Sequence, residues 1–127
     1  MSFELFDKIG KTFSAKISIR SNGNISFSKG AINKYNLAEK AHCRLYYDQE
    51  RNLVGFKFVK DEEKDITTRL IRRGADMIIS ARSFLTYYGI DFEQTKAYIA
   101  QKDEENDLIF IDLNKAKYES TRGRRKK

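Results

Sequence analysis

The sequence contains no proline and no tryptophan, and it has one cysteine, Cys43, and one histidine, His42, among 127 residues. A single cysteine cannot form a disulfide within the chain, which favours a reducing, cytoplasmic setting. No apolar run approaches the roughly 18 residues that a membrane-spanning helix needs. The segment Met1–Asp7 has early acids instead of the basic-then-apolar order of a signal peptide. These absences favour a cytoplasmic protein that does not enter a membrane.

The scarcity of cysteine and histidine also limits the chemistry. His42 and Cys43 are neighbours in a predicted strand, where adjacent side chains point to opposite faces, so they do not share a metal within one chain. The acidic clusters at 48–50 and 103–105 lie in predicted hairpin turns without a partner base, which indicates turn chemistry and not acid–base catalysis. We therefore expect no metal, no cofactor and no enzymatic activity.

The charge is basic overall but unevenly distributed. The net charge is +7, with +6 in residues 1–74, −5 in residues 75–113 and +6 in residues 114–127. A basic first half and a basic tail around an acidic second half suggest one face turned toward a polyanion. The alternative to a polyanion-binding face is that the basic residues only keep the protein soluble.

The first half of the chain combines strand and helix patterns. Strict alternation predicts a strand over Ala15–Ser21, and Asn22-Gly23 is typical of the tight turn that would lead into a strand over Ile25–Phe27. Ser28 is suited to cap a short helix over Lys29–Tyr35. The helix is expected to close at Asn36 in a left-handed conformation, followed by a hairpin with arms Cys43–Tyr47 and Leu53–Phe58.

The same order of elements returns about 53 residues later. The second set comprises strands over Thr67–Arg72 and Met77–Ser80, a helix over Ala81–Tyr88 stopped by Gly89, and a hairpin with arms Lys96–Ala100 and Leu108–Leu113. We predict a cover segment at 1–14, a first unit at 15–60, a linker at 61–65, a second unit at 66–113 and a disordered basic tail at 114–127. The chain from Lys115 onward has too few apolar residues to fold alone.

The run from Ile17 to Phe58 resembles the DNA-binding domain of the AbrB/SpoVT superfamily, the swapped-hairpin fold that is also found in MraZ and in MazE-like antitoxins. The matching pieces are the strand Ile17–Ser21, the turn at Gly23, the strand Ile25–Phe27, the short helix ending Tyr35-Asn36-Leu37, the stretch Ala38-Glu39-Lys40 and the final hairpin. Two such units in one chain resemble the tandem arrangement of MraZ. The family usually has Arg directly after the turn glycine, where this chain has Asn24.

The resemblance implies a mainly β fold with short helices (α+β), in which two β-β-α-β-β swapped-hairpin-like units form an intrachain pseudo-dimer. It also implies binding of duplex DNA and a role in transcription regulation. The candidate nucleic-acid-binding residues are the basic and amide side chains Lys16, Arg20, Asn22, Asn24, Lys29, Lys34, Arg69, Arg72 and Arg73, with the tail residues Arg122, Arg124, Arg125, Lys126 and Lys127.

A pseudo-twofold axis between the halves would place the arginines near Gly23, such as Arg20, and those near Gly74, including Arg72, on one face. The alternative for the second cluster is ion pairing with the acids at 61–65. Two other functions stay open. One is a protein-interaction module, either antitoxin-like or a phage-type inhibitor, and the other is association with RNA or the ribosome through the tail and exposed tyrosines. A homo-oligomer is compatible with each of them.

Overall fold

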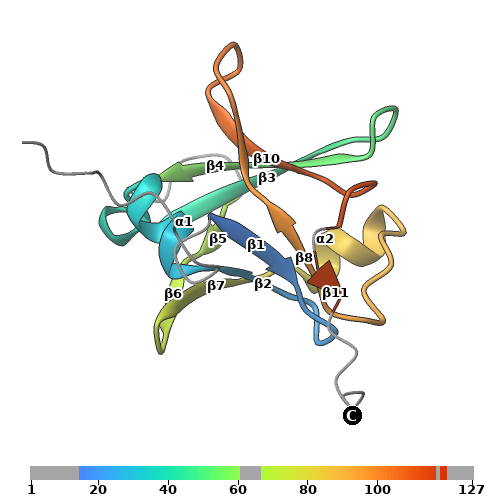
Figure 1. Cartoon of the computed structure of the whole chain (residues 1–127), viewed down its shortest axis with the longest axis horizontal. Helices are drawn as coiled ribbons and strands as arrows, with labels where there is room; N and C mark the ends of the chain where they lie inside the picture. The colour runs from blue at the N-terminus through green and yellow to red at the C-terminus, as the bar shows by residue number, and fades with distance from the viewer. Residues whose placement is uncertain (1–14, 61–66, 117, 120–127) are drawn as a thin grey trace, which may run out of the picture.

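The computed structural model describes residues 15–60 and 67–116, together with the backbone of 118–119. The fold is mainly β, as predicted, with two antiparallel sheets and two short helices at opposite ends of the molecule (Figure 1). The predicted cover segment at 1–14, the linker at 61–65 and the tail residues 120–127 lie outside the described residues. The bounds are β1 (Lys16–Ile19), β2 (Asn24–Phe27), α1 (Lys29–Lys34), the 3-10 helix η2 (Leu37–Glu39), β3 (His42–Asp48), β4 (Leu53–Val59), β5 (Thr68–Arg69), β6 (Ile71–Arg73), β7 (Asp76–Ser80), α2 (Arg82–Tyr87), β8 (Lys96–Ile99), β9 (Gln101–Asp103), β10 (Leu108–Asp112) and β11 (Tyr118–Glu119).

Local capping in the first half follows the sequence closely. The Ser28 hydroxyl accepts a hydrogen bond from the Ala31 backbone N–H at 3.2 Å, which satisfies one of the free donors at the start of α1. Asn36 has the left-handed φ of 57° that ends this helical segment. Gly89 stops α2 in the same way, with φ of 66°.

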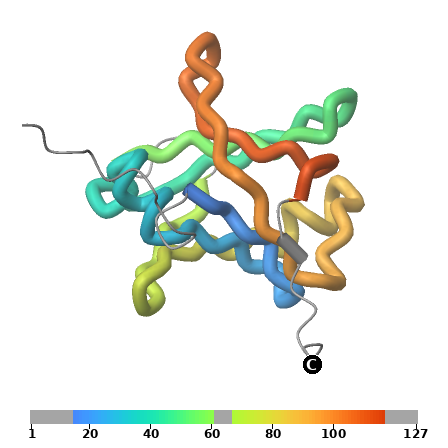
Figure 2. Tube along the Cα trace, viewed as in Figure 1, coloured from blue at the N-terminus to red at the C-terminus, as the bar shows by residue number. Residues whose placement is uncertain are grey.

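The second half differs from prediction at two places. The strand predicted over Thr67–Arg72 is split at Leu70, so that β5 belongs to the five-stranded sheet and β6 to the six-stranded sheet. The arm predicted at Lys96–Ala100 is likewise split at Ala100, and Figure 2 follows β8 and β9 as the chain passes from one sheet to the other. Leu70 and Ala100 are both buried, because each sits at a corner between the sheets.

The two halves of the chain meet inside each sheet. The six-stranded sheet has the order β11-β8-β1-β2-β7-β6 and the five-stranded sheet the order β5-β3-β4-β10-β9. The pair β2–β7 joins the strand before α1 to the strand before α2, and the pair β4–β10 joins the last strands of the two hairpins. Neither half supplies a whole sheet, so each sheet forms only when both halves are present.

The core lies between the inner faces of the two sheets. Ile17, Ile25 and Phe27 from the six-stranded sheet and Phe56 and Ile111 from the five-stranded sheet are buried. The ring of Phe27 contacts the ring of Phe56 edge to face at a centroid distance of 5.4 Å. Leu37, at the start of η2, and Leu85, within α2, are also fully buried and belong to this core.

The basic tail begins with a short piece of structure. We expected disorder from Lys115 onward, but Tyr118–Glu119 pair with β8 as the edge strand β11. The prediction is therefore wrong for these two residues. Backbone hydrogen bonds to an available sheet edge explain the difference, since they need no apolar side chains.

Gly23 is required at the turn between β1 and β2. Its φ is +92°, and a Cβ added there would lie 2.8 Å from the Cβ of Arg82 and 3.2 Å from its Cα. Gly74, in the turn between β6 and β7, has φ of +62° and open space around it.

We predict that Gly74→Ala lowers the free energy of unfolding by about 1 kcal/mol, from left-handed backbone strain alone. Gly23→Ala should cost at least about 2 kcal/mol, since the steric clash adds to the strain.

Urea unfolding of both variants checks this prediction. Equal losses in the two variants would contradict it, because the contact with Arg82 distinguishes the two turns.

Candidate nucleic-acid interface

The outer face of the six-stranded sheet gathers several of the predicted binding residues. Directly opposed residues of an antiparallel pair share a face, and the register places Ser18 opposite Ser26, Ser26 opposite Ile78 and Ile78 opposite Ile71. Side chains two positions away on the same strands share that face. The charged and amide residues brought to it are Lys16, Arg20, Asn24, Arg73 and Asp76.

Arg20 is held across this face by two contacts. Its Nε donates to the Ser26 hydroxyl at 3.2 Å, and its Nη2 lies 3.8 Å from Oδ2 of Asp76. The Arg20 side chain is 45% exposed, so the ion pair contributes little to stability. The contacts orient the guanidinium along the sheet surface and leave part of it accessible.

Arg72 does not join Arg20 on this face. It pairs with Met77, which is 6% exposed and faces the core, so Arg72 projects from the opposite side of the edge strand β6. The prediction that Arg20 and Arg72 share a face is therefore wrong, and Arg73 takes the place expected for Arg72. Successive side chains of a strand point to opposite faces, so a shift of one residue in the pairing of β6 with β7 would exchange the faces of Arg72 and Arg73. The sequence does not reveal that pairing.

The turn between β1 and β2 brings in an arginine that sequence analysis missed. Arg82, the first residue of α2, places its Nη1 3.5 Å from the Asn22 carbonyl oxygen, while the Ala81 N–H donates to the Gly23 carbonyl at 3.0 Å. The side-chain oxygen of Asn22, a predicted nucleic-acid-binding residue, accepts a hydrogen bond from the Asn24 N–H at 3.0 Å and is thus engaged within the turn. Alignment of the two halves pairs Lys29 with Arg82, and this match was the signal that could have identified Arg82.

The remaining predicted residues are spread over other surfaces. Lys29 begins α1 and is exposed, whereas Lys34 ends that helix and lines a cleft on another side of it. Arg69 belongs to the five-stranded sheet, where it pairs with His42. The tail residues Arg122, Arg124, Arg125, Lys126 and Lys127 lie outside the described residues.

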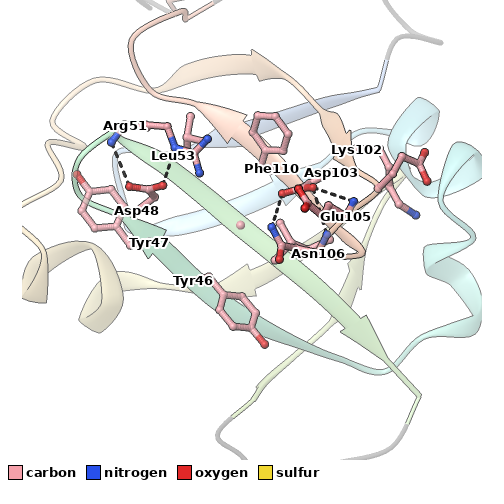
Figure 3. A pocket seen from close by; sticks show the side chains of 13 residues that line it. Tyr46, Tyr47, Asp48, Arg51, Leu53, Lys102, Asp103, Glu105, Asn106 and Phe110 are labelled. Atoms are coloured by element: carbon pink, nitrogen blue, oxygen red, sulfur yellow. Dashed lines mark hydrogen bonds and ion pairs between the residues drawn. The ribbon is translucent and has the colours of Figure 1, made fainter.

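A groove on the outer face of the five-stranded sheet contains the two acidic turns (Figure 3). It has a volume of about 470 Å³ and runs between the β3–β4 and β9–β10 hairpins over Gly55 and Phe110. Asp48 accepts from the Arg51 N–H at 3.1 Å and Asp103 from the Asn106 N–H at 3.2 Å. Both carboxylates therefore stabilise their turns by hydrogen bonds, as predicted.

The His42–Cys43 pair is arranged as predicted. Cys43 is fully buried, and burial raises the pKa of its thiol far above the usual range, which leaves it protonated and unreactive. His42 lies on the other face of β3, with Nδ1 3.4 Å from the Thr67 hydroxyl. In residues 15–60 and 67–116, no group of three or more His, Cys, Asp or Glu side chains is placed to hold a metal ion.

Comparison of the chain with protein-family models, with curated proteins and with solved structures gives no match. Among the described residues, neither short helix has the length or the apolar character to cross a membrane.

Asp48 provides a pH test of the turn hydrogen bonds. The Arg51 backbone N–H, and then the Arg51 side chain, hold the pKa of Asp48 below its usual value of 3.8. A carboxyl group whose pKa is lowered by folding stabilises the protein above its unfolded pKa, and this contribution disappears as the pH falls through the folded pKa. We predict that Asp48→Asn lowers the melting temperature at pH 6 and that its deficit relative to the natural chain vanishes near pH 2.

Glu50→Gln removes the same charge from the same turn and serves as the control. Melting temperatures measured from pH 6 to pH 2 should show little deficit for it. A deficit of Asp48→Asn that is the same at every pH would contradict the role of the ionised carboxylate.

Proposed function

We propose that this protein binds duplex DNA through the outer face of the six-stranded sheet and acts in transcription regulation. The observation that carries the proposal is the placement of Arg20 and Arg73, with Lys16, on one sheet face. Asp76 is the one acid that the described strand registers put there. A surface with this charge attracts the phosphate backbone, which dominates the affinity of proteins for DNA.

The architecture proposed with this function is an AbrB- or MraZ-like swapped-hairpin pseudo-dimer within one chain. Its support is the order strand–strand–helix–hairpin, which occurs twice, and the pairing of equivalent strands across the halves in β2–β7 and β4–β10. In such an arrangement the two turns beside Gly23 and Gly74 are equivalent. Arg20 and Arg82 flank the first turn, and Arg73 precedes the second.

Several acids of the second half lie away from this face. Asp103 ends β9, Glu104 and Glu105 follow it in the β9–β10 turn, and Asp112 lies on β10 of the five-stranded sheet. These four acids therefore do not offset the positive charge of the face, whereas Asp76 does so in part. We propose that the basic tail at 120–127 adds affinity without sequence specificity, because its lysines and arginines would contact phosphates only.

Arg73 and Arg72 form a matched pair for testing the proposed face. Each change to alanine removes one positive charge from the same edge strand, but only Arg73 shares the outer face with Arg20. We predict that Arg73→Ala weakens duplex binding about tenfold and lowers the slope of log affinity against log salt by about one. Arg72→Ala should have a much smaller effect.

Fluorescence anisotropy at two salt concentrations, with duplex DNA, single-stranded DNA and RNA, measures both quantities. A chain lacking residues 120–127 separates the tail from the sheet face and keeps β11. Equal effects of Arg73→Ala and Arg72→Ala on duplex binding would contradict the proposal. So would a preference for RNA that the chain lacking residues 120–127 no longer shows. If the protein binds no nucleic acid and one other protein co-purifies with it in a fixed stoichiometry, the result would favour a protein-interaction module instead.

A further inference from the structure

A second cleft in the molecule is lined by lysines. It lies between the end of α1, the residue after η2, strand β4 and the β9–β10 hairpin, and its volume is about 310 Å³. Lys34, Lys40, Lys57 and Lys102 line it, and Asp107 is the one acid among its lining residues. The volume is at the lower end of the range for sites that bind small molecules.

The charges in this cleft are incompletely balanced. Asp107 lies 3.5 Å from Nζ of Lys57 and 3.4 Å from Nζ of Lys102, and these contacts hold the pKa of its carboxyl below the usual range. One carboxylate against four lysines leaves three net positive charges at the cleft. Ammonium groups offer hydrogen-bond donors and no acceptor, so an anion with several oxygens is the complementary ligand.

The equivalent hairpin, β3–β4, shows that the fold does not require Lys102 and Asp107 at this turn. Aligned on the two hairpins, Asn52 occupies the place of Asp107, with φ of 60° against 54°, and Tyr47 occupies the place of Lys102. The Tyr47 hydroxyl donates to Oδ1 of Asn52 at 2.6 Å, and its ring packs against Tyr88 at a centroid distance of 4.8 Å. The position equivalent to Lys102 and Asp107 is thus filled by neutral contacts, so the charges at this turn belong to the β9–β10 hairpin alone.

The cleft also offers apolar surface beside the lysines. Tyr35 and Phe58, which are both partly exposed, are among its lining residues, and Nζ of Lys34 lies 5.7 Å from the centre of the Tyr35 ring. A ligand with a phosphate group and a less polar body would satisfy both parts of the wall. An inorganic ion alone would leave the aromatic part unused.

We propose that this cleft is a binding site for a small phosphorylated compound. The phosphate oxygens accept hydrogen bonds from Lys57 and Lys102 in competition with Asp107, while Lys34 and Lys40 add positive charge at the rim. The body of the compound packs against the aromatic side chains. This site is separate from the outer face of the six-stranded sheet, so the inference goes beyond the proposed binding of DNA.

Calorimetric titration of the full chain with pyrophosphate and with adenosine triphosphate tests the site. Adenosine serves as the ligand without phosphate, and we expect it not to bind. Lys102→Gln should weaken binding of the two phosphate compounds about tenfold. Lys115→Gln, which removes an exposed lysine outside the cleft, should leave it unchanged.

Asp107→Asn gives the sharper test. Asparagine already adopts the same left-handed conformation at Asn52, so the turn is expected to fold. Removal of the competing carboxylate should tighten the binding of pyrophosphate about fivefold. A purely structural role for Asp107 would leave the affinity unchanged or lower it, and either result would overturn the proposal.

Duplex DNA titrated in parallel separates the two proposed sites. Arg73→Ala should leave pyrophosphate binding intact, and Lys102→Gln should leave duplex binding intact. If neither phosphate compound binds the natural chain or Asp107→Asn, the site does not exist as proposed. If Lys102→Gln weakens duplex binding while pyrophosphate fails to bind, the lysines belong to the DNA interface and the small-ligand proposal is wrong.

Discussion

The pairing of strands from different halves is the constraint on which this structure depends. The β2–β7 pair and the β4–β10 pair lie inside the two sheets, away from the edge strands, and each joins one half of the chain to the other. The Phe27 ring meets Phe56 and Phe58 at centroid distances of 5.4 and 5.3 Å, which links the first of these sheets to the second. A half on its own would expose both its unpaired strand edges and the inner faces of its sheets, at a high cost in buried apolar area.

This constraint also explains which features could be predicted from the sequence. The element order, the Ser28 cap and the left-handed Asn36 are local properties, and the structure confirms them. The splits at Leu70 and Ala100 were missed, because alternation of apolar residues does not show that a strand leaves one sheet for another. The predicted face of Arg72 was wrong for a related reason, because the face on which its side chain lies follows from the register of β6 against β7.

The candidate sites were predictable to different degrees. Arg20 and Arg73 could be proposed from their nearness to turn glycines, because hairpin geometry is local. The lysine cleft could not, since Lys34 and Lys102 are 68 positions apart in the sequence and meet only through the β4–β10 pairing. Comparison of the two halves position by position gives one clue to this cleft, because Lys102 and Asp107 stand where the first half has Tyr47 and Asn52.

Native-state hydrogen exchange of the full chain tests the interlocking of the halves most directly. If the central pairs hold both sheets together, amides of β2, β4, β7 and β10 should exchange with one common free energy, equal to that of global unfolding. Protection that persists in β2 and β4 while β7 and β10 exchange at a clearly lower free energy would show that the first half folds without the second, and would contradict the account.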